Sequence, residues 1–395
     1  MTTSTTELII SGRQTWSAVG AMAMCVAMLI ASEFMPVSLL TPIADDLNAT
    51  EGMAGQAISI SGLFAVGTSL IIPTVASHFD RRSVLMALTG LMLASLLLIA
   101  EAPNFAVLMV ARALLGFTIG GFWALATATI MRLVPRDDVP KALGLMYMGN
   151  AVATAFAAPI GSYLGGIIGW RGVFWALAPI VVLNLIWQWV SLPPIPPQAA
   201  NSLGKVLGLL KRRNVAFAML GVMLTFAGAF ATFTYLRPFL ETYTQVTVPQ
   251  LSLLLLGLGV AGFAGTYGAS ALLGRHLYPM LKWLPMALSI VTIIMLITGH
   301  ELWMVGLTMI VWGAINSAIP VAWSTWLSQG IRDDPESGGG LIVAAIQLSI
   351  MLGAAFGGLL LDHMSIAATL IGGAILLMLA SFTVGDGQRL KGQRS

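Results

Sequence analysis

Apolar stretches long enough to cross a membrane recur along the whole chain and are separated by short polar breaks. A helix rises about 1.5 Å per residue, so about 20 apolar residues cross the ~30 Å hydrocarbon core of a bilayer. The pattern predicts twelve such helices, in two sets of six, over residues 16–42, 52–77, 83–100, 105–133, 141–168, 172–192, 215–240, 248–274, 279–299, 302–328, 338–361 and 365–384. We therefore expect an all-α integral membrane protein.

The longest polar break lies in the middle of the chain, over residues 194–214. It combines prolines with a cluster of Lys and Arg, which cannot lie in hydrocarbon. The sequence Arg-Asp-Asp follows both the fourth predicted helix, at 136–138, and the tenth, at 332–334, as expected of a duplicated unit. We therefore expect two pseudo-symmetric six-helix halves, residues 1–193 and 215–395, joined by the linker 194–214.

Charged residues in the breaks differ between the two sides of the predicted bundle. The N-terminus, the breaks after even-numbered helices and the C-terminus are rich in Lys and Arg, whereas the other breaks are mostly acidic. Loops rich in Lys and Arg stay in the cytoplasm. The sequence therefore predicts that both termini are cytoplasmic and that the chain is a multi-pass protein of a bacterial inner membrane.

Composition argues against several other classes of protein. Hydrophobic residues make up 57% of the chain and charged residues only 9%, whereas soluble domains carry about 25% charged residues. The net charge of +3 does not indicate a nucleic-acid partner, because the basic residues lie between apolar stretches. His300-Glu301 lacks the second histidine of a zinc-protease motif, since Met304 stands at that position. We expect no cofactor, no metal and no enzymatic activity.

Two charged residues lie deep inside predicted helices, where such residues are usually functional. Glu33 is the only acid deep in any predicted span, and burial disfavours the charged form of such a group, so that it could exchange a proton near neutral pH. Arg112 lies at a similar depth in the fourth helix and needs a partner for its permanent charge. We expect ionised Glu33 to pair with Arg112. The alternatives are a carboxylate paired permanently for packing and an arginine that only braces its helix against backbone carbonyls.

Aromatic and amide side chains inside the predicted helices are candidates for contact with a ligand. Aromatic faces and amides suit a flat, polar, uncharged molecule. Each of these side chains has the alternative role of packing one helix against another. The candidates are Trp123, Asn150, Phe230, Tyr235, Asn316, Trp323 and Gln347.

Several motifs together resemble the major facilitator superfamily. They are Glu-Phe-Met-Pro-Val-Ser at 33–38, the segment 108–116 around Arg112, Ala-Pro-Ile-Gly at 158–161 with Gly-Trp-Arg at 169–171, and Trp-Ser-Thr-Trp at 323–326. The first three are similar to the helix 1, proton-coupling and antiporter motifs of the twelve-helix drug:proton antiporters. Within that group, the chain resembles the bacterial purine ribonucleoside efflux pumps.

The loop between the second and third helices departs from the pattern of this family, Gly-x-x-x-Asp-Arg-x-Gly-Arg-Arg. Pro73 stands at the first Gly, Ser77 at the Asp and Asp80 at the second Gly, whereas Arg81 and Arg82 match. The resemblance implies a gating role for Asp80, Arg81, Arg82 and Pro159.

The resemblance implies a secondary transporter in the lipid bilayer, acting as a monomer. Its partners would be a small uncharged solute, namely purine ribonucleosides or analogues, and protons, exchanged across the membrane by antiport. Export of sugars or hydrophobic drugs by the same mechanism is an alternative. A passive facilitator, a membrane-embedded enzyme and a non-transporting sensor are others.

Overall fold

The structure is a computed structural model that describes residues 12–197, 203–331, 333 and 335–391. The described residues form helices and contain no strand. The helices are α1 (Gly12–Ser38), α2 (Leu40–Asp46), α3 (Glu51–Ala76), α4 (Arg81–Ala100), α5 (Phe105–Leu133), α6 (Val139–Ser191), α7 (Leu203–Gly208), α8 (Arg213–Thr234), α9 (Leu236–Phe239), α10 (Val248–Ile297), α11 (Leu302–Gly330), α12 (Pro335–His363) and α13 (Ile366–Val384). Arg332 and Asp334 of the repeated motif, and both chain ends, lie outside the described residues.

Twelve membrane spans follow from the lengths of these helices. Eleven apolar helical stretches within the described part of the chain are long enough to cross a bilayer, and one of them, Lys141–Ser191, has 51 residues. A straight helix of that length would be about 77 Å long at about 1.5 Å per residue, more than twice the hydrocarbon thickness. It is broken at Gly169, whose φ of 73° and ψ of 162° are not helical. The stretch therefore makes two spans, and the twelve predicted helices are confirmed.

The predicted and observed boundaries differ most in the first and seventh spans. The prediction 16–42 corresponds to α1 and α2, which are separated at Leu39, and the prediction 215–240 corresponds to α8, which ends at Thr234. Pro36 lies within the last turn of α1 and has no N–H to donate. An apolar sequence continues through both interruptions, so hydropathy alone does not reveal them.

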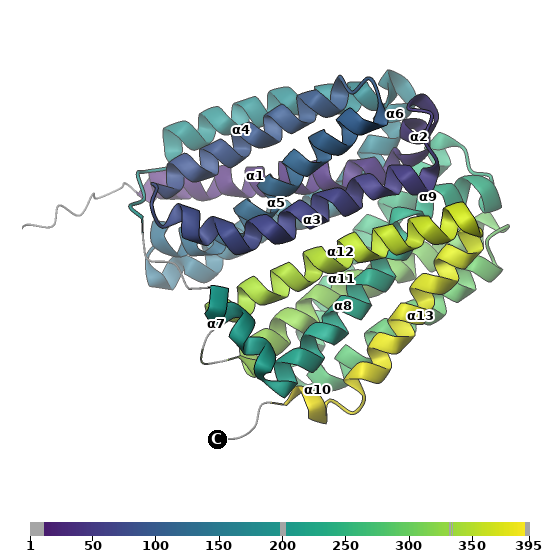
Figure 1. Ribbon diagram of the computed structural model, residues 1–395. Coiled ribbons are helices and arrows are strands. Elements are labelled where there is room, and N and C mark those ends of the chain that lie inside the picture. The colour runs from purple at the N-terminus through teal and green to yellow at the C-terminus, as the bar shows by residue number, and fades with distance from the viewer. Residues whose placement is uncertain (1–11, 198–202, 332, 334, 392–395) are drawn as a thin grey trace, which may run out of the picture.

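The helices pack into two bundles, as Figure 1 shows. One hydrophobic core draws its members from residues 18–195 and a second from residues 209–390. Within the first bundle, α3 and α5 approach closely because Gly116 and Gly120 of α5 lie against the backbone carbonyls of Ser61 and Ala65. The glycine-rich segment of α5 thus serves helix packing.

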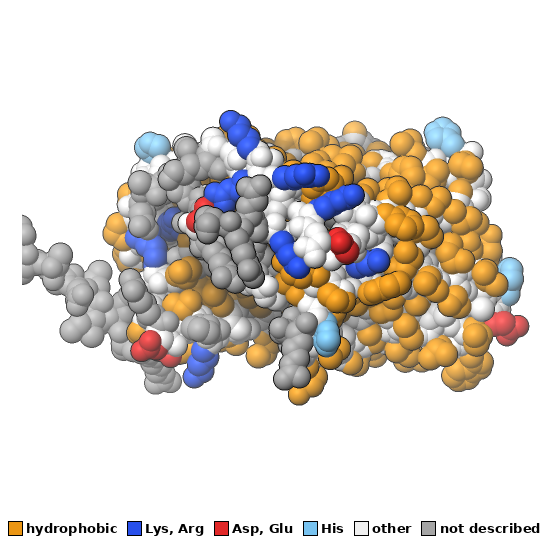
Figure 2. Space-filling view, turned by 90° about the horizontal axis from the view of Figure 1, so that it is seen from below, with side chains coloured by type: hydrophobic (Ala, Val, Ile, Leu, Met, Phe, Trp, Pro, Cys, Tyr) orange, Lys and Arg blue, Asp and Glu red, His pale blue; other side chains and the backbone are white. Residues whose placement is uncertain are grey.

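The two ends of the molecule can be told apart by their loops. We call the end with loops 47–50, 101–104, 245–247 and 298–301 the distal end, and the opposite end, with loops 77–80 and 134–138, the linker end. Figure 2 shows Lys and Arg side chains gathered over part of one face, whereas the rest of that face is mainly hydrophobic. Large hydrophobic side chains such as Trp303, Ile297 and Leu183 are exposed on the helices. An apolar flank of this extent fits a lipid environment, and the chain is a multi-pass membrane protein.

The two bundles meet at the distal end. Figure 1 shows α3 and α12 side by side along the boundary between them. Two apolar clusters contain residues of both bundles, and they include Val37, Ile58, Ile350 and Ala354 in one and Leu40 in the other. All of these positions lie in the distal parts of their helices. The space between the bundles is therefore closed on the distal side.

Candidate functional site

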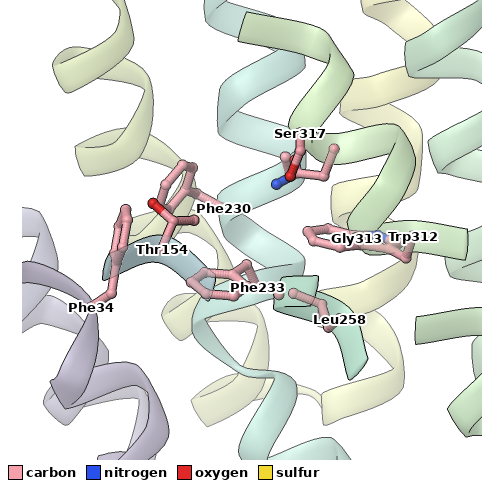
Figure 3. A pocket seen from close by; sticks show the side chains of 11 residues that line it. Phe34, Thr154, Phe230, Phe233, Leu258, Trp312, Gly313 and Ser317 are labelled. Carbon is pink, nitrogen blue, oxygen red and sulfur yellow. The ribbon is translucent and has the colours of Figure 1, made fainter. Parts of the chain in front are cut away.

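A cavity lies between the two bundles. Its walls come from α1 and α6 of the first bundle and from α8, α10 and α11 of the second (Figure 3). The lining residues are Phe34, Thr154, Ala229, Phe230, Phe233, Leu258, Gly259, Trp312, Gly313, Asn316 and Ser317. Mostly apolar walls with a few polar groups are typical of small-molecule sites.

Aromatic rings form most of one side of this cavity. Phe34 of α1 faces Phe230 and Phe233 of α8, with ring centroids 5.9 and 5.8 Å away (Figure 3). Phe233 also stacks on Trp312 of α11, with a centroid distance of 6.3 Å and an angle of 9°. Trp312 is fully buried and donates its Nε1–H to Thr292, so its polar atom is already satisfied. The partly exposed rings of Phe34, Phe230 and Phe233 therefore give the cavity a flat apolar wall.

Three polar side chains complete the lining. Thr154 comes from α6, and Asn316 and Ser317 come from neighbouring positions of α11. An amide both donates and accepts hydrogen bonds, and a hydroxyl does the same. The cavity thus combines ring faces with hydrogen-bonding groups and contains no charged residue among its lining.

Glu33 and Arg112 are both buried and lie outside the lining of this cavity, and no ion pair joins them. The exposed fraction is 3% for Glu33 and 0% for Arg112. The Arg112 guanidinium donates from Nε to the Ala57 carbonyl at 3.0 Å and from Nη1 to the Ser32 carbonyl at 2.9 Å. Its Nη2 has no hydrogen-bond partner among the described residues. The expected direct pair is thus absent, because the guanidinium is aimed at the peptide before Glu33 and braces helix backbones.

Other candidates from the sequence lie apart from the cavity lining. Tyr235 is fully buried at the distal end of α8 and donates its hydroxyl to the Ala354 carbonyl at 2.7 Å. Trp323 is buried against Trp326 and Gly221 within the second core. Trp123 stacks on Tyr147 with centroids 5.9 Å apart. These three side chains therefore make packing contacts in this structure.

The two remaining amides differ from Asn316. Gln347 is 6% exposed, is not part of the cavity lining, and its Oε1 has no partner within the described part of the chain. Asn150 is half-buried on α6 and also lies outside the lining. Of the seven candidates for ligand contact, the structure places Phe230 and Asn316 in one cavity.

Three of the four gating candidates, Asp80, Arg81 and Arg82, lie at the linker end, within the first bundle. Asp80 caps α4, where its Oδ1 accepts the N–H of Arg82 at 2.8 Å, and its Oδ2 accepts the N–H of Ile195 at 2.9 Å. Arg82 donates to the Trp189 carbonyl at 2.5 Å. Arg81 is buried, and its backbone N–H bonds to the Ile195 carbonyl at 3.0 Å. Asp80 of the altered loop motif thus has a structural role, because its carboxylate connects the start of α4 to the segment after α6.

Pro159, the fourth gating candidate, is buried inside α6. Two residues later Gly161 lies against Ser38 and Met35 of α1. This segment therefore packs on the distal part of the helix that carries Glu33.

Polar contacts between the bundles at the distal end were not anticipated from the sequence. Asp362 of α12 accepts the hydroxyl of Thr50 at 2.7 Å and the N–H of Gly52 at 3.1 Å. Arg237 of α9 donates to the Ser38 carbonyl, and Thr41 donates to Glu241 at 2.6 Å. From the sequence, Asp362 and Glu241 were recognised only as acidic residues in loops, and no sequence pattern predicted their hydrogen-bond partners.

Phe34 lines the cavity, but it was not identified as a site candidate from the sequence. Its only signal in the sequence is its position directly after Glu33. A phenylalanine in an apolar helix does not stand out by composition.

One ion pair at the linker end perturbs an acid outside the spans. Arg212 donates to both carboxylate oxygens of Asp333, at 2.8 and 2.6 Å. This bidentate contact lowers the pKa of Asp333 from 3.8 to about 2. Among the residues the structure describes, no group of three or more His, Cys, Asp or Glu side chains could hold a metal ion.

Comparison with known proteins identifies the family of this chain. A family model described as Major Facilitator Superfamily matches residues 22–339. The purine ribonucleoside efflux pump NepI of Salmonella enteritidis PT4 is 39% identical over 378 residues, which is 96% of this chain and 95% of the pump. A Pseudomonas aeruginosa protein named transcription regulatory protein OpdE is 46% identical over 371 residues, 93% of this chain and 92% of that protein.

Solved structures give the same fold. An inward-facing, occupied structure of a bacterial homologue of the lysosomal transporter Spinster superimposes with a TM-score of 0.78 at 13% identity, covering 92% of this chain and 95% of that one. The nucleoside transporter NupG gives a TM-score of 0.77 at 13% identity, covering 93% of this chain and all of that one. At this identity the likeness concerns the fold alone.

Proposed function

Because the chain belongs to the Major Facilitator Superfamily and is therefore a transporter of small molecules, we propose that it exports purine ribonucleosides or their analogues in exchange for protons. The observation that carries this proposal is the cavity between the bundles, which has aromatic walls, one amide, two hydroxyl groups and no charge. A nucleoside has a flat aromatic base and an uncharged polar sugar, and these suit such a lining.

The name of the Salmonella relative supports the substrate class. NepI is described as a purine ribonucleoside efflux pump, and the similarity extends over nearly the full length of both chains. The name of the Pseudomonas relative points to regulation instead. The cavity between two six-helix bundles favours transport, because a regulator has no need of a ligand site that both bundles build.

Proton exchange rests on Glu33 and Arg112. A transporter driven by protons needs a group whose charge alternates, and Glu33 is a buried acid that directly precedes the lining residue Phe34. Arg112 contacts the peptide that precedes Glu33 and has one unused donor, Nη2. Ionised Glu33 would draw this donor to itself in another state of the cycle, and protonated Glu33 would release it. In this scheme the ion pair forms and breaks during transport.

The remaining features of the proposal concern the whole molecule. Both termini and the linker 194–214 face the cytoplasm of a bacterial inner membrane, so the distal end faces outward. Residues 1–193 and 215–395 move as two halves around the cavity. The protein acts as a monomer, and nucleic acid is not a partner. On this orientation, closure at the distal end makes the present structure inward-facing.

Everted membrane vesicles test the proposed function. In such vesicles an exporter takes substrate up, and an imposed pH gradient, acid inside, should drive accumulation of labelled inosine. Addition of a protonophore should abolish it. Competition by guanosine, ribose and a hydrophobic cation then separates nucleoside export from sugar or drug export. Failure of vesicles with the wild-type protein to accumulate inosine would refute the proposal, and uptake that resists the protonophore and stops at the external concentration would indicate a passive facilitator.

A further inference from the structure

Phe34 makes both aromatic contacts that join the two bundles among the described residues. Its ring lies 5.9 Å from that of Phe230 and 5.8 Å from that of Phe233, whereas the other ring pairs each lie within one bundle. Phe34, Phe230 and Phe233 are each half-buried, and all three line the cavity. Their ring faces are therefore covered only in part by protein.

From this arrangement we infer that Phe34 binds the aromatic base of the ligand by stacking, in place of its present contact with Phe230 and Phe233. The inference rests on the proposed function, because it takes the base of a nucleoside as the ligand. A base stacked on an aromatic side chain is held through its flat face, and such a contact tolerates different bases. Asn316 and Thr154 remain to bond the edges of the base and the sugar.

The position of Phe34 on α1 gives the contact a second consequence. Phe34 follows Glu33, and the carbonyl of Ser32 accepts the hydrogen bond from Arg112 Nη1. Three consecutive residues of α1 are therefore Ser32, which bonds Arg112, the acid Glu33 and the aromatic Phe34. A ligand that moves the Phe34 ring acts on the same turn of helix that the proton acts on.

Stacking at this place also makes binding depend on the separation of the bundles. The ligand would lie between Phe34 of the first bundle and Phe230 or Phe233 of the second, so it would bind best at one separation. A ligand shifts a conformational equilibrium only through its different affinities for the two states. Phe34 would therefore provide such a difference for a flat ligand.

Ligand-binding measurements on four purified proteins test the inference. They are the wild type, Phe34→Leu, Phe34→Tyr and the control Phe117→Leu, which removes a ring that pairs with Phe64 at 4.9 Å outside the cavity. Binding of inosine and of ribose is measured by isothermal titration at one pH, and folding is checked by thermal unfolding. Should Phe34→Leu fail to fold, Phe34→Met replaces it.

The expected result is that Phe34→Leu weakens inosine binding about 5- to 150-fold, the range that loss of one stacked base implies. Phe34→Tyr should stay within about threefold of the wild type, because it keeps the ring, and Phe117→Leu should equal the wild type. Equal inosine affinity of Phe34→Leu and the wild type would overturn the inference and leave the proposed function standing. If the wild type binds no purine nucleoside, the proposed function fails, and the inference fails with it.

Discussion

The guanidinium of Arg112 donates a hydrogen bond of 2.9 Å to the carbonyl of Ser32. Through this bond and the bond from Nε to the Ala57 carbonyl, one side chain of α5 connects α1 and α3. The acceptor is the peptide that directly precedes Glu33, so the charge of Arg112 acts next to the acid without pairing with it. We therefore expect protonation of Glu33 to change the electrostatic attraction between α1 and Arg112.

Substitution of Arg112 should disturb this link strongly. Arg112→Lys keeps the charge but cannot donate to two separate carbonyls with a planar fork. Hydrogen bonds from charged groups are worth about 1.5–3 kcal/mol each, so we expect a loss of pH-driven transport on the order of tenfold or more and a shifted pH profile. Vesicle uptake of inosine measures both. Arg132→Lys is the matched control, because Arg132 bonds the Pro196 carbonyl at the linker end; an equal loss in both variants would argue against a special role for Arg112.

The two mid-span amides should behave differently. Asn316 lines the cavity, whereas Gln347 does not. Loss of one hydrogen bond costs about 1 kcal/mol, which corresponds to about a fivefold higher Kd. Asn316→Ala should therefore raise the Kd for inosine several-fold, measured by isothermal titration, while Gln347→Ala leaves it nearly unchanged. The reverse order would show that the ligand lies outside the cavity seen here.

Asp362 should hold the distal end closed. Its carboxylate accepts two hydrogen bonds from the start of α3 in the other bundle. Asp362→Ala removes both, so the open state should gain population on the order of tenfold. The rate at which a membrane-impermeant thiol reagent modifies Ala229→Cys in the cavity, applied from the distal side, measures this.

Glu301→Ala provides the control for that experiment. Glu301 is an exposed acid at the same end, and its side chain makes no hydrogen bond or ion pair in the part of the chain that the structure describes. It should leave the rate of modification unchanged. No increase in Asp362→Ala, or an equal increase in both variants, would mean that the apolar clusters alone keep the distal end closed.

The pair of Arg212 and Asp333 should make stability depend on acid pH. The pKa of Asp333 is lowered to about 2 in the folded protein, below its ordinary value of 3.8. The pair therefore contributes its full stabilisation above about pH 4 and loses it as the pH falls towards about 2. Thermal unfolding at several pH values should show a smaller acid-induced drop for Asp333→Asn than for the wild type. At neutral pH the effect should be small, because the pair is exposed; identical pH curves would contradict this assignment.

The sequence was enough to predict the twelve spans, because the bilayer requires apolar stretches of a fixed length. It also placed Glu33 and Arg112 at similar depths, since depth follows from residue count along a helix. Whether two side chains meet depends as well on the rotation of each helix about its axis, which residue count does not give. Arg112 turned out to face a backbone carbonyl one residue away from Glu33.

The contacts between the bundles could not be predicted from the sequence for a related reason. Tyr235 belongs to the same aromatic stretch of sequence as Phe230, but it follows directly after the end of α8 and lies at the distal closure, not in the cavity. Asp362 had the same appearance as other loop acids. The roles of Tyr235 and Asp362 depend on how one bundle packs on the other, and this packing cannot be predicted from a single sequence.

The variant Glu33→Gln tests the central claim, proton exchange through Glu33, most directly. Glutamine resembles the protonated acid in shape but cannot release a proton. The protein should therefore still bind inosine with a Kd within a few-fold of the wild type, while everted vesicles should no longer accumulate inosine when a pH gradient is imposed. Accumulation by Glu33→Gln against a concentration gradient, with the pH dependence of the wild type, would show that the proton binds elsewhere and would contradict the account.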